Sequence, residues 1–180
     1  MEIVNHKEAR TGDAILWPKK GQVANTLSLI LGWYDPKTWK PRKWKPWHVG
    51  FIVKILPEGE VVTSQAVGNG VHSLVYDSID DLAECKIYRW LKDPDQEKTD
   101  KYAEDHEGDP YDKLDYIWVL LGALSEKFLH WPFRIVNKAQ MCWENLSHYA
   151  RDMGDELQPE EEPCLINKII LKLESKEIRA

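Results

Sequence analysis

Alternating apolar and polar residues mark the first half of the chain as a β-sheet. The run 48–56 alternates most strictly and predicts a strand, because successive side chains of a strand point to opposite faces. One face of this strand would carry Val49, Phe51, Val53 and Ile55, and the other His48, Gly50, Ile52 and Lys54. The turn at 57–59 joins it to a partner strand at 60–66. In that partner strand, one face carries Val61, Thr63 and Gln65.

Shorter apolar runs predict three more strands, at 14–17, 71–76 and 85–90. Turn residues support the first two, since Thr11-Gly12-Asp13 and Gly68-Asn69-Gly70 directly precede them. We therefore expect five strands, four of which follow one another between residues 48 and 90.

Helical spacing of apolar residues recurs along the chain. The run 22–31 places Val23, Leu27, Ile30 and Leu31 on one face. The polar stretch 95–109 predicts an exposed helix, and a mostly apolar helix body follows at 116–128. A further helix at 139–153 carries one stripe formed by Cys142, Leu146, Tyr149 and Met153. Three prolines predict a long loop at 32–46.

This order of strands and helices is an α+β pattern, in which we expect an antiparallel sheet packed against helices. The length of 180 residues fits one domain with a sizeable core. We expect residues 1–10 to form a loose polar arm, residues 11–173 the domain and residues 174–180 a tail. The hydrophobic share of 43% and charged share of 30% are those of a soluble globular protein.

Charge and cysteine content narrow the function classes. The net charge of −6 argues against a general nucleic-acid binder. Three widely spaced cysteines argue against a disulfide framework, and the sequence has no paired cysteines of the zinc-binding type. No apolar run has the length of a transmembrane span. The first residues lack the apolar core of a signal peptide, so we expect a cytoplasmic protein unless a leader precedes this sequence or a phage protein reaches a cell wall without one.

Two residues have the context of a thiol catalyst. Cys142 stands at the predicted start of a helix, where the helix dipole favours the reactive thiolate. His48 begins a strand and shares a face with Gly50, which leaves room beside the ring. A histidine base and a cysteine nucleophile are the two parts of a cysteine hydrolase. The competing interpretations are that Cys142 is a small buried core residue, and that His72 is the functional histidine.

Five segments, taken in order, resemble one family. Residues 12–16 resemble the "GD-apolar" strand of NlpC-type papain-fold cysteine hydrolases, residues 48–53 their "HVG" strand, and residues 61–66 the next strand. Residues 108–112 (Gly-Asp-Pro-Tyr-Asp) and 142–144 (Cys-Trp-Glu) are similar to segments of the YiiX-like proteins. Because the cysteine follows the histidine, the order resembles the circularly permuted branch, which also includes the lecithin:retinol acyltransferase-like proteins.

The resemblance implies a permuted papain-like fold and a cysteine peptidase or amidase that needs no metal or organic cofactor. Cys142 would attack the carbonyl carbon, His48 would transfer the proton, and Gln65 would orient His48. The backbone N–H of Cys142 would help hold the oxyanion. Two residues depart from the family pattern: Trp143 stands where a small residue is usual, and Gln65 replaces the more common acidic residue, histidine or asparagine. A glutamine can fix the histidine tautomer, but it adds no negative charge.

The substrate depends on residues outside this trio. Trp44, Trp47 and Trp143 are the expected substrate-binding residues, and a small peptide or cell-wall peptide is the expected substrate. The Trp- and Lys/Arg-rich segment 33–47 could instead be a solvated loop or a membrane-surface patch. A lipid acyltransferase or thioesterase with a lipid entrance near 116–128 is therefore an alternative function. A third alternative is a binding module that has lost catalysis. The sequence leaves the oligomeric state open.

Overall fold

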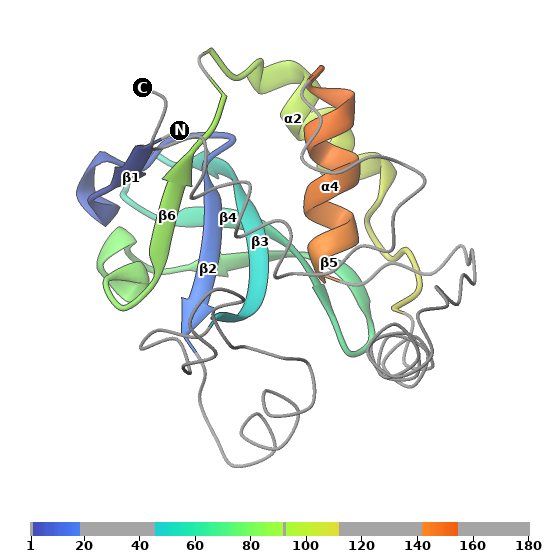
Figure 1. Cartoon of the computed structure of the whole chain (residues 1–180), viewed down its shortest axis with the longest axis horizontal. Coiled ribbons are helices and arrows are strands. Elements are labelled where there is room, and N and C mark those ends of the chain that lie inside the picture. Colours follow the sequence, from blue (N-terminus) through green and yellow to red (C-terminus); the bar gives the residue numbers. More distant parts are fainter. Residues whose placement is uncertain (1, 19–45, 92, 112–141, 155–180) are drawn as a thin grey trace, which may run out of the picture.

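The computed structural model describes residues 2–18, 46–91, 93–111 and 142–154. They form an α+β arrangement in which a curved antiparallel sheet carries helices on one face (Figure 1). The strands are β1 (Glu2–Val4), β2 (Ala14–Pro18), β3 (Pro46–Ile55), β4 (Val61–Val67), β5 (Gly70–Tyr76) and β6 (Lys86–Arg89). The helices are α2 (Gln96–Asp105) and α4 (Cys142–Asp152), with the 3-10 turns η1 (His6–Glu8) and η2 (Ile79–Leu82).

The sheet has the order β1-β6-β2-β3-β4-β5. One end of the sheet is a meander in which β3, β4 and β5 are joined by short turns, with Gly50 opposite Gln65 and Gln65 opposite His72. Strand β2 pairs with β3 on one side and with β6 on the other. The strands predicted at 14–17, 48–56, 60–66, 71–76 and 85–90 are thus confirmed, with small shifts at their ends.

The stripe predicted for the helix at 139–153 forms the interface between α4 and the sheet. Cys142, Leu146 and Tyr149 are buried, and Met153 packs at the edge of the same core. The ring of Tyr149 stacks on Phe51 of β3, with ring centroids 3.8 Å apart and planes 4° from parallel. Large apolar side chains of this kind supply the burial that holds a helix on a sheet.

Helix α2 lies beside α4 and is only partly the exposed helix that its polar sequence predicts. Thr99, Tyr102 and Ala103 are buried. The Thr99 hydroxyl hydrogen bonds with the Tyr149 hydroxyl at 2.9 Å, and the Tyr102 hydroxyl donates to the carbonyl oxygen of Asn145 at 3.1 Å. These bonds satisfy polar groups inside the core and tie the two helices together.

The opposite face of the sheet has its own smaller core, built against η1 and η2. The buried members are Val4, Ile15, Ile52, Val61, Leu82 and Ile87. The two faces of β3 therefore contribute to different cores: Val49, Phe51 and Val53 face the helices, whereas Ile52 faces the other way. This alternation decides on which side each functional residue lies.

Residues 1–10 correct one expectation, because they are not a loose arm. Glu2–Val4 pair with β6, and Val4 is buried in the smaller core. Three residues are too few to show a period of two, and the pairing strand lies more than eighty residues away, so the sequence pattern did not reveal this strand.

Several expected features lie outside the described residues: the helices at 22–31 and 116–128, the loop between residues 32 and 45, and the domain end near 173. Among the helices that the structure describes, none is long and apolar enough to span a membrane.

Candidate functional site

The site centres on the neighbouring strands β2, β3 and β4. His48 of β3 pairs with Trp17 of β2, and their ring centroids lie 5.2 Å apart. Gln65 of β4 lies opposite Gly50 and points to the same face as His48. A Cβ atom on residue 50 would approach the Gln65 Cγ to 2.9 Å and the Ser64 carbonyl oxygen to 2.5 Å. Glycine at position 50 therefore leaves the space in which His48 and Gln65 meet.

A hydrogen-bond network fixes the Gln65 amide and, through it, the tautomer of His48. The amide nitrogen of Gln65 donates to the Thr63 Oγ1 at 2.8 Å and to the Tyr76 hydroxyl at 3.0 Å. The amide oxygen then faces the His48 Nε2 at 2.8 Å and accepts its proton. With the proton on Nε2, the Nδ1 atom carries the lone pair and is the basic nitrogen of the ring.

Burial lowers the pKa of His48 from 6.5 to about 4, and the hydrogen bond that His48 donates to Gln65 opposes this shift only in part. A charged imidazolium is disfavoured because the surroundings exclude water and Gln65 adds no negative charge. His48 is therefore a neutral imidazole at pH 7, ready to accept a proton during a reaction rather than already charged.

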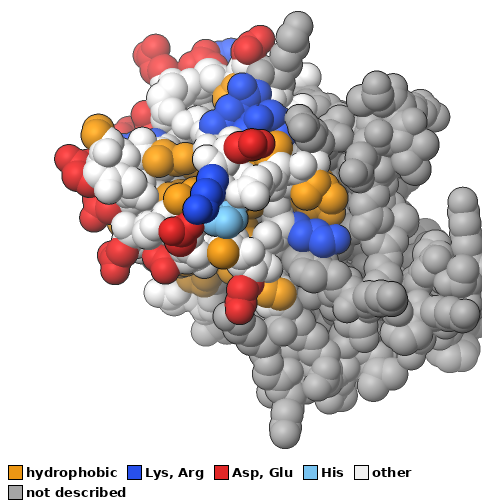
Figure 2. All heavy atoms as spheres, turned by 90° about the vertical axis from the view of Figure 1, so that its left-hand side faces the viewer, with side chains coloured by type: hydrophobic (Ala, Val, Ile, Leu, Met, Phe, Trp, Pro, Cys, Tyr) orange, Lys and Arg blue, Asp and Glu red, His pale blue; other side chains and the backbone are white. Residues whose placement is uncertain are grey.

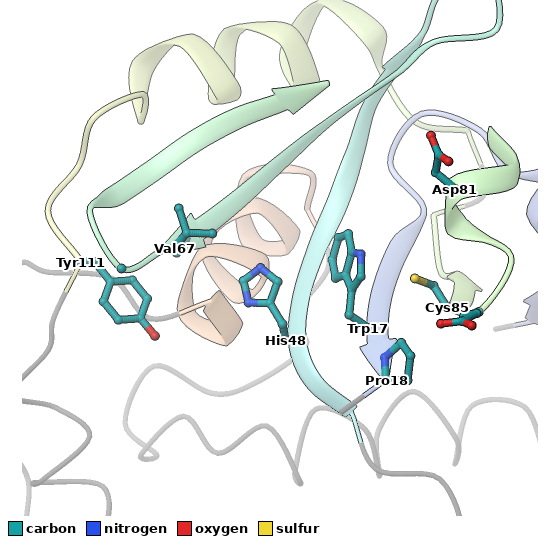
Figure 3. Close-up of a pocket in the computed structure, with 10 residues that line it drawn as sticks. Trp17, Pro18, His48, Val67, Asp81, Cys85 and Tyr111 are labelled. Atoms are coloured by element: carbon teal, nitrogen blue, oxygen red, sulfur yellow. The ribbon is translucent and has the colours of Figure 1, made fainter. Parts of the chain in front are cut away.

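A cavity of about 500 Å³ opens in front of His48. Its described lining residues are Trp17, Pro18, His48, Ala66, Val67, Gly68, Asp81, Glu84, Cys85 and Tyr111. Figure 3 shows His48 between Tyr111 and Val67 on one side and Trp17 on the other, with Cys85 beyond Trp17. Asp81 and Glu84 are exposed. Figure 2, which views the side of the molecule that carries β1, shows acidic side chains gathered along one edge of that face.

The structure places Cys142 away from this cavity. Cys142 is the first residue of α4, is 1% exposed and belongs to the helix-facing core. The side chain of Asn145, one turn later in α4, donates to the Ser64 Oγ at 3.3 Å, and Ser64 points to the opposite face from its neighbour Gln65. Cys142 and His48 thus lie on opposite faces of the sheet. Within the described residues, His48 hydrogen bonds with Gln65 and not with Cys142.

The other predicted site residues divide in the same way. His48 and Gln65 are brought together, whereas Trp44 lies outside the described residues. Trp47 lies in β3 and Trp143 in α4, but the description does not extend to their side chains. The competing histidine, His72, hydrogen bonds with Glu107 at 2.8 Å instead of facing the cavity of His48.

Trp17, Cys85 and Tyr111 are among the lining residues of the cavity that sequence reasoning missed. For Trp17 the one sequence signal is that it lies in a predicted strand. If that strand pairs with the His48 strand, the antiparallel register can place the two side chains opposite each other. Cys85 and Tyr111 reach the cavity from segments far along the chain, which no local pattern indicates. In the part of the chain that the structure describes, no group of three or more His, Cys, Asp or Glu side chains could hold a metal ion.

No family model matches the sequence, and no curated protein is significantly similar to it. The function therefore has to be argued from the residues of the site.

Proposed function

We propose that the chain is a cysteine hydrolase that cleaves an amide bond, with His48 as general base and Gln65 as its orienting residue. The hydrogen bond between the His48 Nε2 and the Gln65 Oε1, at 2.8 Å, carries this proposal. The proposed substrate class is a small peptide or a cell-wall peptide, and the proposed fold family is the permuted NlpC type.

The neutral state of His48 supports this role. In the reaction, a thiol would give its proton to the Nδ1 of His48 while the sulfur attacks the carbonyl carbon. The same nitrogen would return the proton to the leaving amine, and water would hydrolyse the resulting thioester. Gln65 keeps Nδ1 basic throughout, because its amide oxygen holds the other ring proton.

Cys142 is the proposed nucleophile, at the first turn of α4 where the backbone N–H and helix dipole favour a developing anion. Cys142 is buried in the helix-facing core, whereas His48 hydrogen bonds with Gln65. The proposal therefore requires a movement that brings the two side chains together. Val49, the chain neighbour of His48, belongs to the same buried cluster as Cys142. The required movement therefore involves this end of β3 and the start of α4.

Turnover of a panel of peptide amides and soluble cell-wall peptides tests the proposal. We expect Cys142→Ala and His48→Ala to abolish cleavage, whereas His6→Ala, at a histidine that is not among the described lining residues of the cavity, serves as the control that keeps it. The acid limb of kcat/KM should lie near pH 4 rather than near the ordinary histidine pKa, because kcat/KM follows the free enzyme. Cleavage that survives Cys142→Ala would contradict the assignment of the nucleophile.

A binding module without catalysis is the second candidate, favoured by the burial of Cys142 on the far face of the sheet. Iodoacetamide labelling of the folded chain, mapped by mass spectrometry, separates the two functions. A catalytic Cys142 should be labelled in the wild type and less so in His48→Ala. Labelling confined to Cys85, with Cys142 protected until the chain is unfolded, would favour the binding module.

A further inference from the structure

A short segment after α2 passes close over the edge strand β5. The backbone N–H of Val71 donates to the Asp109 carbonyl oxygen at 2.9 Å, and the N–H of Gly108 donates to the Val71 carbonyl oxygen at 2.8 Å. A Cβ atom on Gly70 would lie 2.9 Å from the Asp109 carbonyl oxygen, so the close approach requires glycine there. These two hydrogen bonds hold the segment around Gly108 and Asp109 against the outer edge of β5.

Glu107 fastens this segment through its side chain. One carboxylate oxygen bonds with the His72 Nδ1 at 2.8 Å, and the other accepts from the backbone N–H of Ser73 at 2.8 Å. We call these two contacts the Glu107 clamp. Partial burial raises the pKa of Glu107, but the bonds from His72 and Ser73 outweigh burial and hold this pKa below its ordinary value. Glu107 is therefore ionised at neutral pH, and its bonds are charge-assisted.

Tyr111, four residues after Glu107, is a wall of the cavity in front of His48. Figure 3 shows its ring on one side of His48 and the Trp17 ring on the other. Tyr111 also packs against the helix-facing core, so its position depends on both the core and the segment that carries it. A displacement of that segment would change the width of the cavity next to the basic nitrogen.

We propose that Tyr111 is a specificity-determining residue of the His48 cavity and that the Glu107 clamp is its positioning device. The walls beside His48 are the aromatic rings of Trp17 and Tyr111, and the charged side chains among the described lining residues are the acids Asp81 and Glu84. Aromatic faces bind flat, apolar or positively charged groups. The described walls of the cavity therefore favour a substrate with a neutral or cationic side chain beside the amide over one with a carboxylate.

Chemical modification of His48 by diethyl pyrocarbonate tests the clamp without any substrate, because this reagent acylates the neutral imidazole. The rate of modification at His48 is measured by mass spectrometry and divided by the rate at His6 in the same molecule. Global unfolding raises both rates, so a higher ratio reports a local opening of the cavity. We expect Tyr111→Ala and Glu107→Ala each to raise this ratio several-fold, and Tyr111→Phe to leave it near the wild-type value. Glu104→Ala, a matched exposed glutamate in α2, should leave the ratio unchanged.

The double variant decides whether Glu107 acts through Tyr111. Glu107→Ala in the Tyr111→Ala background should add nothing further, since the wall is already removed. Glu107→Gln, which keeps an acceptor oxygen for the Ser73 N–H, should give an intermediate ratio and guards against a Glu107→Ala variant that does not fold. Additive effects, or a Glu107→Ala ratio equal to that of Glu104→Ala, would overturn the positioning role.

Binding of three probes by NMR tests the ligand class: the N-acetyl amides of phenylalanine, lysine and glutamate. We expect the phenylalanine and lysine amides to bind more tightly than the glutamate amide, and Tyr111→Ala to weaken the phenylalanine amide most. Equal or tighter binding of the glutamate amide would refute the ligand class. This inference rests on the proposed function only where it assumes that the bound amide is cleaved. A chain that binds these probes but cleaves no amide would refute the proposed hydrolase and leave the ligand class and the role of Tyr111 standing.

Discussion

Because His48 is neutral in the folded chain, the free energy of unfolding should fall in mild acid, and His48→Gln should remove this contribution. Burial lowers the pKa of His48 from 6.5 to about 4 in the folded state. One pKa unit corresponds to about 1.4 kcal/mol, so protonation of His48 in the folded chain costs about 3 kcal/mol more than in the unfolded chain. Because His48 is partly exposed at the cavity, this figure is an upper value.

The sign follows from which state binds the proton. Between the folded pKa near 4 and the unfolded value of 6.5, the unfolded chain holds a proton on this residue that the folded chain lacks. The free energy of unfolding therefore falls as the pH decreases through this window, by up to about 1.4 kcal/mol per pH unit from His48. Above pH 6.5 the residue contributes no pH dependence, and below pH 4 its full penalty is present.

Urea unfolding at a series of pH values across this window measures the effect. His48→Gln is neutral at every pH and should flatten the dependence relative to wild type. NMR titration of the His48 ring gives the folded pKa directly. Parallel stability curves for wild type and His48→Gln, or a titration midpoint near 6.5, would refute the argument that His48 is held neutral by burial.

Two further substitutions test the packing of the site and the sheet. Gly50→Ala should destabilise the fold by about 2 kcal/mol, because the new methyl group would meet the Ser64 carbonyl oxygen and the Gln65 Cγ, and NMR should show the His48–Gln65 hydrogen bond weakened. Asp13→Asn should cost about 3 kcal/mol in urea unfolding, because Asp13 is 2% exposed and its carboxylate accepts from Arg89 at 3.0 Å. A change below about 0.5 kcal/mol in either variant would contradict the packing described.

The sequence predicted the elements around the site because each has its own period. Strict alternation over 48–56 places His48 and Val49 on different faces, and the structure confirms this division. The stripe that begins at Cys142 likewise faces the core as its helical spacing requires. The Gln65 contact followed from the same reasoning, since adjacent antiparallel strands place facing side chains within reach when the register allows.

What the sequence did not reveal depends on segments that are distant along the chain. The Glu107 clamp joins β5 to residues more than thirty positions later, and Cys85 and Tyr111 reach the cavity from opposite sides of it. Three-residue β1 pairs with a strand near residue 89. No local periodicity encodes such contacts, because they depend on how the chain closes long loops.

The relation between Cys142 and His48 shows the same limit most clearly. Periodicity predicts the face of β3 that carries His48 and the face of α4 that carries Cys142, but not which face of the sheet the helix covers. Both faces of β3 contribute to a buried core, and the contacts of α4 with Phe51 and Ser64 lie on the face opposite Gln65. A helix that instead covered the Gln65 face would bring the thiol to the histidine. Labelling of Cys142 in the folded chain therefore measures that choice directly, and with it the difference between a hydrolase and a binding module.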